Sequence, residues 1–270
     1  MTQPILNLAF YFFADLTRIN DLRQTLEQVC AAHHLKGSMI LSYEGINGMV
    51  AGEEANARAL IAFFKEHPAF GQMPIKESWS ETIPFSKMQI KIKPEIVTMR
   101  VPGVRAVERT GTHLAPEAFQ KLIREGGEDV VVIDVRNDFE YQLGTFKGSL
   151  NPKTLAFNEF PDVVREHQSQ WKDKTVAMFC TGGIRCEKVS SWMLEQGFDE
   201  VYQLEGGVLN YFERVEDAHE DWDGELFVFD QRVALDTQLQ ATDTIMCLKC
   251  NRPTDPGDSC AKCGHVHVTR

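Results

Sequence analysis

The sequence predicts a mixed α/β protein: an α+β unit first, then a parallel α/β unit, then a small cysteine-rich region. Three observations support this prediction. Over the first 100 residues, strand-like alternation of apolar residues is interrupted by helical stripes. Between residues 112 and 217, continuous apolar runs alternate with helical segments. Two CxxC pairs then fall within the last 24 residues.

The N-terminal unit, residues 1–105, has the order strand, helix, strand, strand, helix, strand. The strands alternate apolar and polar residues, and the helices repeat apolar residues every three or four positions. The sequence SMILSYEGINGMVAG supplies the two middle strands around a turn that contains glycine. In order, the segments cover residues 6–12, 19–33, 38–52, 57–64 and 88–92. This order predicts a ferredoxin-like α+β domain, followed by a proline-broken linker.

The second unit, residues 112–217, has the features of a parallel sheet. The runs DVVVIDV and TVAMFC are continuously apolar, as expected for strands buried on both faces. A helix is predicted after Pro116, since proline suits the first helical position. Another helix, RCEKVSSWMLEQ, should stop at Gly197. Residues 218–270 are expected to form a C-terminal extension.

Composition limits the cellular setting. The chain has 270 residues, of which 43% are hydrophobic, which is enough for a substantial core. No apolar run approaches the roughly 20 residues that span a bilayer, and the first residues lack signal-peptide features. Seven cysteines in an uneven distribution favour metal binding or thiol chemistry over a disulfide framework. We therefore expect a cytoplasmic protein without a membrane contact, and no obligate protein partner is indicated.

The negative charge is local. Of the net charge of −11, most comes from residues 181–245, which carry 4 Lys and Arg against 15 Asp and Glu. A solvated surface is the simplest explanation of this block. Because acidic residues repel phosphate, a nucleic acid would lie elsewhere on the surface.

The stretch FCTGGIRCEK, residues 179–188, joins a buried strand to a helix. The carboxyl end of a strand in an open α/β sheet is where ligands bind. The two glycines allow backbone N–H groups to point inward, and these groups and the helix dipole would stabilise a thiolate or persulfide of Cys180. Arg185 adds a permanent positive charge. The candidate loop comprises Cys180, Thr181, Gly182, Gly183, Ile184 and Arg185.

The spacing within this loop separates two chemistries. Cysteine phosphatases use Cys-x5-Arg to surround a phosphate, whereas this chain has Cys-x4-Arg, from Cys180 to Arg185. The shorter loop suits an anion the size of a sulfur atom. A small buried cysteine before an ordinary turn would explain Cys180 alone, but not the glycines and the arginine.

Several stretches together resemble the bacterial rhodanese-domain tRNA uridine(34) hydroxylase family. They are LSYEGINGMVAG, IDVRNDFEYQLGTFKGSLNP, FCTGGIRCEK, VYQLEGGVLNYFE and FVFDQRVAL. The resemblance implies a ferredoxin-like domain, a rhodanese domain and a short C-terminal region, with Cys180 as the active-site cysteine. It further implies oxidation of the wobble uridine of tRNA to 5-hydroxyuridine, with molecular oxygen as co-substrate and the anticodon loop as partner. The electron donor is not identifiable from the sequence.

Three residues near the loop have two interpretations each. Asp134 and Arg136, at the end of the strand VVIDVR, either orient the loop or form a structural ion pair with one another. Cys186 either resolves an oxidised or persulfidated Cys180 by disulfide exchange, or is a small packed helix residue.

The C-terminal stretch CLKCNRPTDPGDSCAKCGHVH predicts a metal site. Two CxxC pairs separated by a turn-rich segment are typical of tetrahedral structural zinc, with ligands Cys247, Cys250, Cys260 and Cys263. Reduced thiols in a disordered tail are the alternative. Four thiolates complete the coordination, so His265 and His267 are expected to be exposed to solvent.

A mild basic excess marks the candidate tRNA contact. Residues 76–109 carry seven Lys and Arg against four acids, and Lys87, Lys91 and Lys93 are the candidate phosphate ligands. A solvated strand face would explain the same pattern. Two further functions compete with hydroxylation: a rhodanese-type sulfurtransferase that carries a cysteine persulfide, and a tRNA-binding module without catalysis.

Overall fold

The structure is a computed structural model that describes residues 4–230, 232–257 and 259–267. Its contacts divide the chain into two compact units, Met1–Thr98 and Met99–Arg270. We describe each unit by itself. Within the described residues, no helix is long and apolar enough to cross a membrane.

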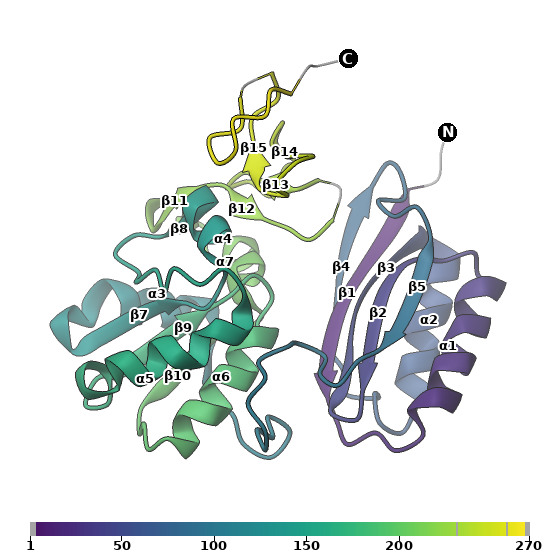
Figure 1. Cartoon of the computed structure of the whole chain (residues 1–270). Helices are drawn as coiled ribbons and strands as arrows, with labels where there is room; N and C mark the ends of the chain where they lie inside the picture. Colours follow the sequence, from purple (N-terminus) through teal and green to yellow (C-terminus); the bar gives the residue numbers. More distant parts are fainter. Residues whose placement is uncertain (1–3, 231, 258, 268–270) are drawn as a thin grey trace. The chain divides into compact units, whose positions relative to one another are not determined.

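The first unit is one sheet with two helices on one of its faces (Figure 1). The strand order is β4-β1-β3-β2-β5, and only β5 runs parallel to its neighbour, β2. In chain order, the elements are β1 (Ile5–Phe13), α1 (Ile19–Ala32), β2 (Lys36–Ser42), β3 (Gly45–Glu53), α2 (Glu54–Glu66), β4 (Ile75–Ser80) and β5 (Met88–Ile92). The first four strands have the ferredoxin-like arrangement that the sequence predicts.

The last strand of this arrangement differs from the prediction. The structure places β4 directly after α2, and the predicted strand at residues 88–92 is an additional fifth strand beside β2. The sequence of β4, IKESWS, lies at the sheet edge and has no fully buried residue. Its apolar signal is therefore weak, which explains why the alternation pattern missed it.

The helices cover this sheet because their apolar stripes match its inner face. Alternate residues of β1, such as Leu6, Leu8 and Phe10, pack against buried residues of α1 and α2. The ring of Phe10 lies 4.9 Å from the ring of Phe64 in α2, edge to face. Cys30 lies in the same core at 1% exposure. This cysteine is therefore a packing residue of the first unit.

The second unit is a parallel α/β sandwich extended by short strands. Its sheet has the order β6-β10-β9-β7, with every pair parallel. Helices α3 and α7 cover one face and α5 and α6 the other (Figure 1). The elements are β6 (Thr112–Leu114), α3 (Pro116–Glu125), β7 (Val130–Asp134), α4 (Asp138–Leu143), β8 (Gly144–Phe146), α5 (Phe160–Trp171), β9 (Thr175–Phe179), α6 (Ile184–Glu195), β10 (Val201–Leu204) and α7 (Gly207–Arg214). The predicted mixed α/β class is confirmed.

The chain after α7 continues the same core. Strand β11 (Trp222–Gly224) pairs with β8, so that Trp222 lies opposite Phe146. The two rings meet edge to face at 5.0 Å. Two further pairs of two-residue strands complete the extension: β12 (Leu226–Phe227) with β13 (Ala234–Leu235), and β14 (Ile245–Met246) with β15 (Pro253–Thr254). The extension is thus packed on the sandwich as far as Leu239.

Candidate active site

The loop between β9 and α6 holds Cys180 at the carboxyl end of a buried strand, as predicted. Strand β9 ends at Phe179, and α6 begins at Ile184. Gly183, between them, has φ +101°, a conformation that favours glycine, and its N–H donates to Cys180 Sγ at 3.1 Å. At Gly182, an added Cβ would meet open space. The loop conformation therefore favours glycine at Gly183, whereas the surroundings of Gly182 leave space for a Cβ.

The surroundings of Cys180 favour its thiolate. Burial by itself raises the pKa of this thiol, since the side chain is fully enclosed. A hydrogen bond from the Cys186 side chain, the charge of Arg185 and the backbone N–H groups of residues 185 and 186 outweigh burial. Together they lower the pKa of Cys180 from 9.0 to about 5. A sulfur anion is thus stable here at neutral pH, at the N-terminus of a helix.

Two other buried cysteines, Cys186 and Cys30, remain protonated. Burial and the hydrogen bond to Cys180 raise the pKa of Cys186 well above its usual value. Its S–H can therefore act as a donor to the Cys180 thiolate. In the first unit, burial raises the pKa of Cys30 to about 12. Burial alone therefore does not lower the pKa of a thiol, and the low pKa of Cys180 follows from its loop.

Helix α7 holds the loop from the other side. The N–H of Val208 donates to the Cys180 carbonyl at 3.0 Å, and the N–H of Leu209 donates to the Thr181 carbonyl at 3.4 Å. Gly207 has φ +69°, and a Cβ there would lie 2.5 Å from both carbonyl oxygens. This glycine therefore permits the close approach that fixes the backbone of the loop.

Arg185 is locked in place by a buried carboxylate that the sequence analysis did not identify. Its guanidinium donates to both oxygens of Glu140, at 2.7 and 2.8 Å, and the Glu140 side chain is fully buried. Burial raises the pKa of Glu140, but the charge of Arg185 outweighs it and lowers that pKa below its usual value. Glu140 also accepts from the N–H of Asn137 at 3.1 Å, at the start of α4. The spacing of Asn137 and Glu140, N-x-x-E, is typical of a helix start and could have pointed to Glu140 in the sequence.

Asp134 and Arg136 pair with one another, which is the structural alternative of the two predicted. Arg136 Nη2 lies 2.6 Å from Asp134 Oδ2, and both side chains are buried. The hydroxyl of Thr145 donates to the same oxygen at 2.9 Å. The guanidinium lies 5.6 and 5.2 Å from the ring centres of Phe179 and Trp222. This pair therefore ties β7 to β8, β9 and β11 beneath the loop.

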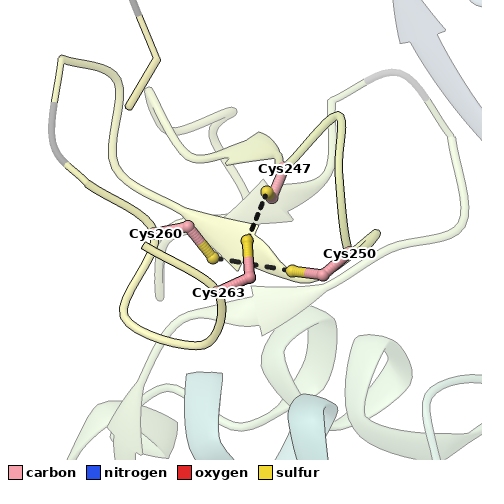
Figure 2. Close-up of side chains that lie close together, drawn as sticks. All are labelled: Cys247, Cys250, Cys260 and Cys263. Atoms are coloured by element: carbon pink, nitrogen blue, oxygen red, sulfur yellow. Dashed lines mark hydrogen bonds between the residues drawn. The ribbon is translucent and has the colours of Figure 1, made fainter. Parts of the chain in front are cut away.

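The four C-terminal cysteines converge on one point, as Figure 2 shows. All four Sγ atoms lie within 4.8 Å of one another, and the two closest pairs, Cys247 with Cys263 and Cys250 with Cys260, are each separated by 3.6 Å. This cluster could hold a metal ion. The prediction for His267 is wrong, because it is buried at 7% exposure.

The predicted phosphate ligands lie on the first unit. Lys91 is in β5, Lys93 follows it, and Lys87 precedes it, and all three are exposed. Lys91 alternates with buried Ile90, so its side chain is on the solvent side of the strand. The structure therefore leaves these lysines accessible, without bringing them together with a ligand.

Comparison with known proteins defines the class of this fold and site. Residues 5–96 match the UPF0176 acylphosphatase like domain, and residues 115–214 match the Rhodanese-like domain. The cysteine at the end of β9, enclosed by the N-termini of α6 and α7, thus occupies the loop of a rhodanese-like domain. A solved rhodanese-like domain from Anabaena sp. is 17% identical, covers 43% of this chain and 80% of its own, and has a TM-score of 0.34.

The whole chain belongs to the tRNA uridine(34) hydroxylase family. It is 42% identical to the protein of that name from Brucella ovis, over 96% of this chain and 88% of the relative. The protein of the same name from Brucella suis is also 42% identical, over 96% of this chain and 87% of the relative. The resemblance noted in the sequence is therefore confirmed across both units.

Titration tests the environment of Cys180. We expect the ultraviolet absorbance of one thiolate to appear with a midpoint near pH 5, because the folded pKa is about 5. Below that pH the sulfur is protonated, and above it the anion persists through neutral pH. The signal is the difference between wild type and Cys180→Ser, with Cys30→Ser as the control that leaves it unchanged. A midpoint near the ordinary thiol value of about 8.5 would contradict the described environment.

Removal of the Glu140 side chain should destabilise the protein. Glu140→Ala leaves Arg185 buried without its partner, so we expect the free energy of unfolding to fall by about 3–5 kcal/mol. Asp162→Ala is the matched control, since it removes an exposed partner of Arg165, and it should cost less than about 1 kcal/mol. Denaturant unfolding of the full chain measures both. Equal effects of the two substitutions would show that the buried pair has no special role.

Proposed function

We propose that this chain hydroxylates uridine 34 of tRNA, the wobble position, to 5-hydroxyuridine, with Cys180 as the catalytic residue. The observation that carries the proposal is the buried Cys180, with its pKa lowered to about 5, in a chain 42% identical to proteins named tRNA uridine(34) hydroxylase. A rhodanese-type sulfurtransferase could use the same loop. The name of the relatives favours hydroxylation over sulfur transfer.

The proposed chemistry begins with the nucleophilic sulfur. The thiolate, or a persulfide carried on it, adds to C6 of the uracil ring and makes C5 electron-rich. Molecular oxygen then supplies the new hydroxyl oxygen at C5. The second oxygen atom leaves as water, which requires two electrons and two protons from a donor. Loss of the C5 proton and release of the sulfur from C6 restore the ring.

Cys186 has a proposed supporting role. Its S–H donates to the Cys180 sulfur, so the two side chains are neighbours. If Cys180 becomes oxidised or persulfidated, Cys186 can displace the added group and form a disulfide, which a reductant then reopens. This role agrees with a thiol that is protonated in the resting state, because burial and the hydrogen bond to the Cys180 thiolate both raise the pKa of Cys186.

We propose one substrate contact on each unit. The wobble base would have to leave its anticodon stack to reach Cys180, as bases do in other enzymes that modify them. The phosphates would meet the exposed Lys87, Lys91 and Lys93 and avoid the acidic segment 181–245. Such a substrate is met in the cytoplasm, where we place the protein. We propose the division into residues 1–105, 112–217 and 218–270 for these roles.

We propose that the cysteine cluster binds a structural zinc ion. Four sulfurs at the Zn–S distance of about 2.3 Å from one ion are about 3.8 Å apart in a tetrahedron. The two closest pairs are at 3.6 Å, and all four atoms are within 4.8 Å, which fits this geometry. Four thiolates leave no open position, so the ion would hold the tail together rather than take part in the reaction.

Nucleoside mass spectrometry of total tRNA tests the function. Cells that lack the gene should lose 5-hydroxyuridine and its derivatives, and wild type should restore them. Cys180→Ala should restore less than about 1%, since the nucleophile is essential in this mechanism. Cys30→Ala is the matched control, because it removes another buried cysteine. Full restoration by Cys180→Ala, or no change on loss of the gene, would refute the proposal.

Metal analysis tests the zinc proposal. Purified protein should contain one zinc per chain, and Cys260→Ser should lose most of it, because zinc prefers a complete thiolate set. Chelation should lower the melting temperature of wild type and leave that of Cys260→Ser nearly unchanged. Wild-type protein with well under one zinc per chain, purified without chelator, would show that the cluster consists of free thiols.

A further inference from the structure

An exposed phenylalanine lies directly beside the active-site loop. The ring of Phe229 is 57% exposed, and its centre lies 5.7 Å from the guanidinium carbon of Arg185. A single exposed apolar side chain is ordinary on a protein surface. Phe229 differs from other exposed apolar residues because it contacts Arg185. This arginine belongs to the active-site loop, and its charge lowers the pKa of Cys180. The ring thus borders the position that a substrate must reach.

The Phe229 ring packs against a buried phenylalanine. Phe227, at 5% exposure, meets Phe229 edge to face at 5.0 Å and meets Phe139 of α4 in the same way at 5.0 Å. Helix α4 also supplies Glu140, which fixes Arg185. Phe227 and Arg185, the two side chains that contact the Phe229 ring, are therefore both anchored to α4.

The backbone around the ring is also fixed, and at a cost. Val233 has φ +63°, which is strained for a β-branched residue. Its carbonyl accepts from the N–H of Val228 at 2.9 Å, and its N–H donates to the Asp230 carbonyl at 3.1 Å. The Asp230 side chain is buried and pairs with Arg232 at 2.5 Å. The residues on both sides of Phe229 are therefore held by backbone hydrogen bonds, while its ring is exposed.

The negative charge of the surrounding segment favours an uncharged ligand at Phe229. Phe229 lies within the acidic segment 181–245, where phosphate groups would be repelled. Aromatic side chains bind unpaired bases by stacking, which needs no positive charge and is common in RNA recognition. At Gly182, in the same loop, an added Cβ would meet no atom within 4 Å. A neutral pyrimidine ring satisfies these conditions.

We propose that Phe229 is the stacking surface for the unpaired pyrimidine base that approaches Cys180. Arg185 supports the opposite side of the Phe229 ring through a cation–π contact, so that the ring does not turn away. This inference rests on the proposed function for the identity of the base as uridine 34. It goes beyond that function by assigning a substrate-contacting residue in the C-terminal extension.

A double-mutant cycle between protein and RNA tests the stack. The probe is an anticodon stem-loop with either uridine or an abasic residue at position 34, and fluorescence anisotropy gives the dissociation constants. Phe229→Ala should weaken binding of the uridine stem-loop by about 10-fold, the order expected for loss of one stacked base. It should leave binding of the abasic stem-loop unchanged. Phe229→Trp should restore discrimination between the two probes.

Controls separate stacking from other roles. Trp79→Ala removes an aromatic side chain of similar exposure, 48%, in the first unit, and should leave discrimination intact. The salt dependence of binding should be the same for wild type and Phe229→Ala, because no phosphate contact is lost. The Cys180 titration midpoint should also stay near pH 5 in Phe229→Ala, which excludes a purely structural effect on the loop.

The outcomes distinguish this inference from the proposed function. If cells form 5-hydroxyuridine but Phe229→Ala weakens both probes equally, or neither, the stacking proposal is overturned and hydroxylation stands. If wild type binds both probes equally well, the stacking proposal is likewise overturned. Loss of uridine discrimination in Phe229→Ala supports stacking even where restored cells contain no 5-hydroxyuridine, in which case hydroxylation alone is refuted.

Discussion

A negative charge on a fully buried sulfur is the constraint on which the second unit depends. Burial opposes that charge, so the fold must supply donors and positive charge within contact distance. Helix α6 supplies backbone N–H groups at its first turn, Gly183 makes the turn that aims one of them, and Arg185 supplies the permanent charge. Helix α7 then holds the carbonyls on the other side of the loop.

The stabilising arginine creates a second requirement. A buried guanidinium beside a single thiolate would itself need further partners, and Glu140 supplies them with both carboxylate oxygens. Glu140 belongs to α4, which starts at the end of β7 after the buried pair of Asp134 and Arg136. The loop chemistry is thus connected, through two successive ion pairs, to the strand next to β9. A substitution in either ion pair would therefore change the electrostatic environment of the Cys180 sulfur.

Much of the fold was predictable because its signals are local. The alternating pattern in β1, the helical stripes of α1 and α2, and the continuous apolar runs of β7 and β9 are each visible within a few residues. Strand β4 was missed, since an edge strand with mostly polar residues has little pattern. The position of β5 beside β2 was not predictable either, because pairing partners depend on the whole sheet.

The candidate site divides in the same way. Cys180, the glycines and Arg185 lie in one contiguous motif, so the sequence alone identifies them. Glu140 and Gly207 lie far from that motif along the chain, and only folding brings them to it. Phe229 was part of a recognised stretch, yet its exposure and its contact with Arg185 depend on the turn that ends at Val233.

The pairing of β11 with β8 has a consequence for where the rhodanese-like unit ends. The family match stops at residue 214, but Trp222 still covers Phe146 and the guanidinium of Arg136. The segment that matches the rhodanese-like domain is therefore shorter than the segment that closes the core. A protein cut at residue 214 would lose Trp222, which covers the core around Phe146. The end of the domain match and the end of the folded core therefore lie at different residues.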